Sequence, residues 1–146
     1  MPNDREYFHG VNTKRQILVV DDEMINREIL GEYLNSDYDV LFACDGVEAM
    51  ETIRSHKDTL SLILLDLLMP VMSGKEVLKE LKDSADLSHI PVIVITADQE
   101  SEVECLSLGA IDFIPKPYPQ VGVVLARVLR TIELFEDRNI IQSTER

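Results

Sequence analysis

Residues 17–23 read ILVVDDE, a continuous apolar run that ends in three acidic residues. Apolar runs that are continuous rather than alternating indicate strands buried on both faces, as in a parallel sheet. Four later stretches have the same character and predict further strands: 39–43 (DVLFA), 60–65 (LSLILL), 91–95 (PVIVI) and 111–114 (IDFI).

Helical patterns separate these runs. Ser73 followed by Glu76 is a capping-box signature at the start of one helix, and Gly109 fits the left-handed position that ends a short helix over 99–108. Strand and helix alternate five times, which predicts an α/β fold with a doubly wound sheet. The apolar faces of the other helices are Ile25, Ile29, Leu30, Tyr33 and Leu34; Val47, Met50 and Ile53; Val77, Leu78 and Leu81; and Val121, Val124, Leu125, Val128, Leu129 and Ile132.

Composition limits the function. The chain has 146 residues and 45% hydrophobic residues, which suit one domain with one core, and its net charge of −13 disfavours direct contact with nucleic acid. Cys44 and Cys105 lie far apart and predict small core residues in a reducing compartment. No apolar run reaches the ~18 residues of a membrane span, so we expect no membrane contact and a cytoplasmic location.

The polar residues that follow the strands carry the chemistry. Asp21 and Asp22 follow the first run, Asp66 the third, Thr96 ends the fourth, and Lys116 follows the fifth. Ligands of doubly wound sheets gather at the carboxyl ends of the strands, so these side chains should converge. Three carboxylates 4–6 Å apart repel one another, and a hard cation such as Mg²⁺ removes that conflict.

The hydroxyl and the ammonium make the predicted site reactive. A transferring phosphoryl group has negatively charged oxygens that a cation, an ammonium and a hydroxyl can stabilise. A carboxylate in line with them can act as the nucleophile. Each residue also has a plainer interpretation, because an Asp after a strand is often a helix N-cap and a Lys before a Pro is usually on the surface.

Four segments resemble the signature segments of response regulator receiver domains: ILVVDDE at 17–23, LILLDLLMPVMSG at 62–74, VIVITA at 92–97 and GAIDFIPKP at 109–117. The resemblance covers about residues 15–135 and all five strand–helix units. It implies a flavodoxin-like fold with five parallel strands in the order 2-1-3-4-5 and five helices. It also implies a signalling module of a two-component system or phosphorelay that catalyses only its own phosphorylation and dephosphorylation.

The resemblance also implies roles for single residues. Asp66 would accept the phosphoryl group from a sensor histidine kinase or a phosphotransfer protein. Mg²⁺ or Mn²⁺ would bind Asp22, Asp66 and the backbone carbonyl of Leu68, with Asp21 acting through water. Thr96 and Lys116 would contact phosphoryl oxygens, and the Lys116–Pro117 peptide would be cis.

A switch and its surface follow from the same resemblance. Thr96 would move toward the phosphoryl group, and Phe113 would turn inward. The fourth expected helix (99–108), the last strand (111–114) and the fifth expected helix (apolar face 121–132) would then change surface together. A homodimer through these elements is a further expectation. Leu68 and Asp98 occupy positions that tune phosphoryl lifetime in the family, although Asp98 also suits a helix N-cap.

Three alternatives stay open on the sequence. A Mg²⁺-dependent aspartyl-phosphate phosphatase would want an Asp where Leu68 stands, and a flavodoxin-like cofactor module would want a phosphate-binding loop after the first strand. A degenerate receiver that only binds proteins would lack some of the site residues. We expect an arm at 1–14, a receiver domain at 15–137 and an extension at 138–146. Two interpretations of the extension stay open: the start of a linker to an output domain such as a diguanylate cyclase, or part of a stand-alone receiver.

Overall fold

Five parallel strands form one sheet in the order β2-β1-β3-β4-β5, which confirms the predicted topology. The structure is a computed structural model that describes residues 14–117 and 120–144, with side chains described as far as residue 136. The predicted arm therefore lies almost wholly outside the described residues. The strands are β1 (Arg15–Val20), β2 (Tyr38–Ala43), β3 (Leu60–Leu65), β4 (Val92–Thr96) and β5 (Asp112–Pro115).

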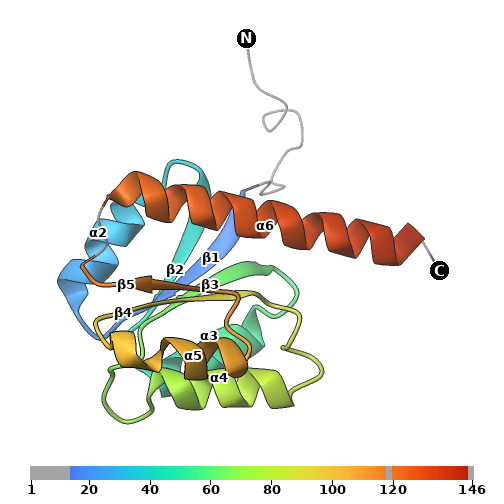
Figure 1. Cartoon of the computed structure of the whole chain (residues 1–146). Helices are drawn as coiled ribbons and strands as arrows, with labels where there is room; N and C mark the ends of the chain where they lie inside the picture. The colour runs from blue at the N-terminus through green and yellow to red at the C-terminus, as the bar shows by residue number, and fades with distance from the viewer. Residues whose placement is uncertain (1–13, 118–119, 145–146) are drawn as a thin grey trace.

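Helices cover both faces of the sheet, as a series of strand–helix–strand crossovers requires. Figure 1 shows α2 and α6 on one face and α3, α4 and α5 on the other. Their bounds are α2 (Met24–Leu34), α3 (Gly46–Ser55), α4 (Gly74–Asp83), α5 (Glu102–Ser107) and α6 (Val121–Thr144).

Two apolar clusters hold these layers together, one on each face of the sheet. Alternate residues of a strand face opposite sides, so Leu18 joins the cluster under α3 and α4 while Val19 joins the cluster under α2 and α6. Both side chains are fully buried. This two-sided burial explains why the strands read as continuous apolar runs, and it leaves the strand ends as the place for polar groups.

Local signals for helix ends are confirmed in part. The Ser73 hydroxyl accepts the Glu76 N–H at 3.3 Å, and Gly109 has a φ of +105° after α5. The predicted helix over 99–108 is instead divided into a 3₁₀ turn at Gln99–Ser101 and the short α5. Asp98 precedes that turn without a capping hydrogen bond to the turn's backbone, and its carboxylate accepts the Ser101 hydroxyl at 2.6 Å.

The apolar face expected for α2 is only partly used by the core. Leu30 and Leu34 are buried, whereas Ile25 is 65% exposed and Tyr33 is 48% exposed. The helix approaches the sheet at Gly31, where an added Cβ would lie 2.6 Å from the Phe42 ring. That close approach sets which side of α2 meets β2, so the neighbouring apolar residues stay outside.

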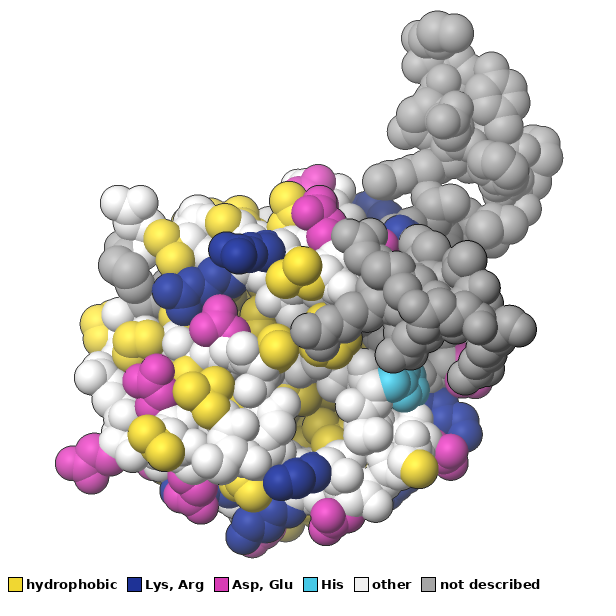
Figure 2. Space-filling model, turned by 45° about the vertical axis from the view of Figure 1, so that its right-hand side comes forward, with side chains coloured by type: hydrophobic (Ala, Val, Ile, Leu, Met, Phe, Trp, Pro, Cys, Tyr) yellow, Lys and Arg dark blue, Asp and Glu magenta, His cyan; other side chains and the backbone are white. Residues whose placement is uncertain are grey.

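The surface is mixed in character. On the face drawn in Figure 2, hydrophobic side chains alternate with acidic and basic ones. Within residues 14–117 and 120–144, no helix combines the length and hydropathy needed to cross a bilayer. The helix predicted at the C-terminus is present as α6, and the domain boundary proposed near residue 137 stays a prediction.

Candidate functional site

The site lies where the strands end, because the backbone carries each polar residue just past its strand. The Asp21 N–H donates to the Ala43 carbonyl at 3.1 Å, and the Asp66 N–H donates to the Val20 carbonyl at 3.0 Å. The Lys116 N–H donates to the Thr96 carbonyl at 2.8 Å. These bonds extend the sheet by one residue and fix the polar residues along a common edge.

Three carboxylates converge at this edge. Oxygens of Asp21, Asp22 and Asp66 lie within 4.8 Å of one another. Asp21 is 2% exposed and Asp66 is 6% exposed, while Asp22 faces solvent. Two buried carboxylates this close require positive compensation, because burial removes the solvent that would otherwise screen their mutual repulsion.

Lys116 supplies part of that compensation. Its Nζ donates to Asp21 Oδ2 at 2.7 Å and to Asp66 Oδ2 at 3.1 Å, although Lys116 follows a different strand from either partner. Burial alone would lower the pKa of the Lys116 ammonium. The hydrogen bonds and charges of Asp21 and Asp66 outweigh burial and raise that pKa, so the group is cationic at neutral pH.

Backbone donors orient the carboxylates. The Glu23 N–H donates to Asp21 Oδ1 at 2.9 Å, and the Leu68 N–H donates to Asp66 Oδ1 at 3.3 Å. Arg27 Nη1 donates to the Asp21 carbonyl at 2.7 Å and so ties α2 to the end of β1. Sequence reasoning missed Arg27, because its partner is a backbone oxygen and no motif marks that contact.

Gly74 is a second residue that sequence reasoning missed. An added Cβ there would lie 2.3 Å from the Asp66 carbonyl oxygen and 2.8 Å from Leu67 Cα. The Gly74 N–H also donates to the Leu67 carbonyl at 3.0 Å. The start of α4 therefore packs directly on the backbone that carries Asp66, and only glycine permits that distance.

The two predicted switch residues, Thr96 at the end of β4 and Phe113 in β5, are both buried. Thr96 is fully buried, and its hydroxyl accepts the Asp98 N–H at 3.3 Å. Within the described residues, no hydrogen bond joins Thr96 to the three carboxylates. Phe113 is 5% exposed and belongs to the cluster under α3 and α4, so its ring already occupies an inward position.

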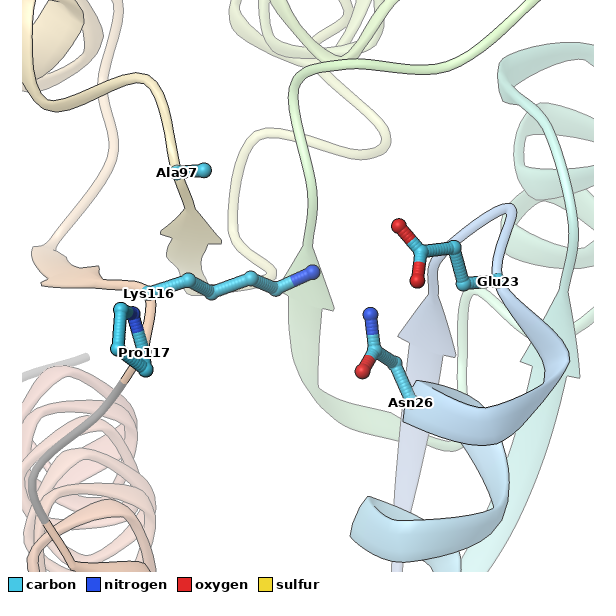
Figure 3. A pocket seen from close by; sticks show the side chains of 5 residues that line it. All are labelled: Glu23, Asn26, Ala97, Lys116 and Pro117. Carbon is cyan, nitrogen blue, oxygen red and sulfur yellow. The ribbon is translucent and has the colours of Figure 1, made fainter.

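A pocket of about 390 Å³ opens beside Lys116 (Figure 3). Its lining comprises Glu23, Asn26, Ala97, Lys116 and Pro117, and the Lys116–Pro117 peptide is cis, as expected. Figure 3 shows Lys116 reaching from the end of β5 toward Glu23 and Asn26, which come from the start of α2. The pocket therefore lies beside the buried site, and Lys116 connects its lining to Asp21 and Asp66.

The acidic cluster fits a hard divalent cation. Its donors are carboxylate oxygens from three residues, one of them exposed, which suits Mg²⁺ because that ion keeps several waters and uses few protein ligands. Asp21, Asp22 and Asp66 are the side chains that would hold it. The Leu68 carbonyl stays a predicted ligand, and the Leu68 side chain is 58% exposed.

Comparison with known proteins gives a consistent identification. The response regulator receiver domain family model matches residues 17–127. The response regulator MprA of Mycobacterium ulcerans is 41% identical over 128 residues, or 84% of this chain and 53% of that protein. Hybrid signal transduction histidine kinase D of Dictyostelium discoideum is 31% identical over 91% of this chain and 8% of that protein.

A solved structure agrees with these relatives. The signal receiver domain of a histidine kinase from Syntrophus aciditrophicus is 34% identical with a TM-score of 0.73, covering 82% of this chain and 90% of that one. This chain spans about half of MprA and a small part of the hybrid kinase, so the match concerns one domain of each. The chain belongs to the response regulator receiver domain family.

Proposed function

We propose that this receiver domain takes a phosphoryl group onto Asp66 and passes the signal on through a change of surface. The observation that carries the proposal is the position of Lys116, whose ammonium contacts both Asp21 and Asp66 inside a three-carboxylate cluster. An ammonium held against two buried carboxylates can also stabilise the negative oxygens of an incoming phosphoryl group.

In the proposed reaction, an Asp66 carboxylate oxygen attacks phosphorus. A phosphorus–oxygen bond forms, the bond from phosphorus to the donor nitrogen breaks, and its electron pair leaves with that nitrogen. Leu68 N–H holds the other Asp66 oxygen, Oδ1, at 3.3 Å, which orients the nucleophile. Lys116 and the Thr96 hydroxyl would then contact phosphoryl oxygens.

A Mg²⁺ ion at Asp21, Asp22 and Asp66 would supply positive charge for the phosphoryl oxygens. The Glu23 N–H and the Lys116 ammonium already hydrogen-bond to the Asp21 carboxylate. These bonds fix the position of its negative charge beside the proposed ion site. Asp22 is the exposed carboxylate of the three. We propose that it contacts the ion directly, because an ion that exchanges with solvent can reach an exposed ligand.

The proposed switch links Thr96 to Phe113 on neighbouring strands, since Thr96 ends β4 and Phe113 lies in β5. Movement of the Thr96 hydroxyl toward the phosphoryl group would break its hydrogen bond from Asp98 N–H and alter the start of the following 3₁₀ turn. The Phe113 ring is already buried in this structure, so the inward turn expected of it is not needed, and its proposed role is to hold that inward position once Thr96 has moved. The surface formed by α5, β5 and α6 would transmit the change.

The proposed phosphodonor is a sensor histidine kinase or a phosphotransfer protein, and the proposed assembly is a homodimer through α5, β5 and α6. Leu68 supports a receiver over an aspartyl-phosphate phosphatase, because its apolar side chain cannot act as the acid–base group two residues after the nucleophile. The presence of all five site residues supports an active receiver over a degenerate one. An output activity would belong to another domain.

The proposed function is tested by incubating the chain with acetyl phosphate and Mg²⁺ and recording the intact mass. We expect a gain of one phosphoryl group that EDTA suppresses, excess Mg²⁺ restores and Asp66→Asn abolishes. Glu48→Gln, a change in an exposed carboxylate on α3, is the matched control and should be phosphorylated like the wild type. Equal phosphorylation of Asp66→Asn would contradict the proposal.

A further inference from the structure

We propose that Glu23 and Asn26 select the phosphodonor by the charge of its leaving group, favouring donors whose phosphorus is bound to nitrogen. This inference rests on the proposed function of Asp66. It concerns the pocket of about 390 Å³ beside Lys116, whose lining includes both residues. That volume is within the range of about 300–1,000 Å³ that is usual for small-ligand pockets.

The charge of this pocket is divided between two sides. Lys116 is directed to Asp21 and Asp66, with bonds of 2.7 and 3.1 Å, so its positive charge is used at the nucleophile. Glu23 makes no side-chain capping bond to α2, and in the described part of the chain its carboxylate has no hydrogen-bond or ion-pair partner. Its negative charge is therefore free to act on an occupant of the pocket.

The other residues that line the pocket could contact an imidazole ring. Ala97 and Pro117 offer small apolar surfaces, and the Asn26 amide offers an oxygen acceptor. Figure 3 shows Glu23 and Asn26 on one side of the pocket and Ala97 and Pro117 on the other. A ring with apolar faces and a charged N–H would meet apolar groups on one side and acceptors on the other.

The bond changes explain why charge selects the donor. Attack by Asp66 breaks the bond from phosphorus to the leaving group, and the electron pair of that bond goes to the leaving group. In a protonated phosphoimidazole or phosphoramidate, the nitrogen group carries positive charge before transfer and departs as neutral imidazole or ammonia. From acetyl phosphate, the group that departs is an acetate anion. The Glu23 carboxylate attracts the first kind of leaving group and repels the second.

Initial rates with phosphoramidate and acetyl phosphate, measured by intact mass at one pH, ionic strength and Mg²⁺ concentration, test the inference. We expect Glu23→Gln to lower the phosphoramidate-to-acetyl-phosphate rate ratio about fivefold, because a unit charge about 4 Å away is worth ~1 kcal/mol in water. Asn26→Asp adds a charge and should raise the ratio about fivefold. Glu28→Gln, on the exposed side of α2, should leave it unchanged.

The use of a ratio separates this inference from the proposed function. Loss of Mg²⁺ affinity in a variant slows both donors, and the ratio cancels that effect. If the variants are phosphorylated on Asp66 with the wild-type ratio, the donor-selection role is wrong while the proposed function stands. If the wild type takes a phosphoryl group from neither donor, both fail.

Discussion

Two clusters of side chains that could hold a metal ion lie in the described part of the chain, and they differ in origin. Asp21, Asp22 and Asp66 follow two different strands that are distant in sequence, whereas Cys44, Asp45 and Glu48 lie close together in sequence around the start of α3. In both clusters the ligand atoms lie within 4.8 Å of one another. Distance between acidic groups therefore does not by itself distinguish a functional site.

Burial and hydrogen-bond partners distinguish the two clusters. In the strand-end cluster, two carboxylates are buried and a lysine from a third strand contacts both. In the helix-start cluster, Asp45 caps α3 by accepting the Glu48 N–H at 2.8 Å, and Cys44 Sγ donates to Glu48 Oε2 at 2.9 Å. Local helix geometry explains the second cluster, while only the fold as a whole assembles the first.

Apart from loss of the acceptor Asp66 itself, the largest effect should come from removing the lysine of the strand-end cluster. We expect Lys116→Ala to slow phosphorylation by acetyl phosphate about 100-fold, as loss of one donor to a transition-state oxyanion usually does. The fold should persist, which circular dichroism can check. Lys79→Ala removes an exposed lysine of α4 and should react at the wild-type rate. Equal rates for the two variants would remove Lys116 from the mechanism.

A second experiment compares the clusters as metal sites. We expect Asp22→Asn to weaken Mg²⁺ binding about tenfold, a loss of ~1.4 kcal/mol, because the ion loses its exposed carboxylate. Glu48→Gln should leave the affinity unchanged. Isothermal titration calorimetry measures both variants against the wild type. If only Glu48→Gln weakened Mg²⁺ binding, the ion would belong to the helix-start cluster, and the strand-end cluster would not be the metal site.

The smallest effect concerns the thiol of the helix-start cluster. The hydrogen bond to Glu48, followed by burial and the nearby charges of Glu48 and Asp45, raises the pKa of Cys44. Glu48→Gln removes that anionic acceptor, so the pKa of Cys44 should fall and more thiolate should form at a given pH. Alkylation of Cys44, read by peptide mass spectrometry, should then begin at lower pH than in the wild type. An unchanged alkylation profile would show that Glu48 does not control the thiol.

The strands and the polar residues at their ends were predictable from sequence because each signal is local. A continuous apolar run such as 17–20 shows burial on both faces, and the polar residue after each run marks the strand end. Parallel strands then place those residues at one edge whatever their separation in sequence. For this reason the convergence of Asp21, Asp66 and Lys116 followed from the alternation of strands and helices.

The pocket and the supporting contacts were not predictable, since they depend on how helices settle on the sheet. Glu23 and Asn26 line the pocket only because the start of α2 faces the end of β5 across the strand ends (Figure 3), and Gly74 matters only because α4 packs against the backbone of Asp66. The exposure of Ile25 has the same cause, because helical spacing shows that a face exists without showing how much of it meets the core.

Phosphoryl transfer to Asp66 is tested most directly by locating the phosphoryl group after reaction with acetyl phosphate and Mg²⁺. Borohydride reduces an aspartyl phosphate to homoserine, and fragmentation of the resulting peptides identifies the modified position. We expect homoserine at residue 66 and at no other carboxylate. Homoserine at Asp21 or Asp22, or a phosphorylated chain that yields none at residue 66, would contradict it.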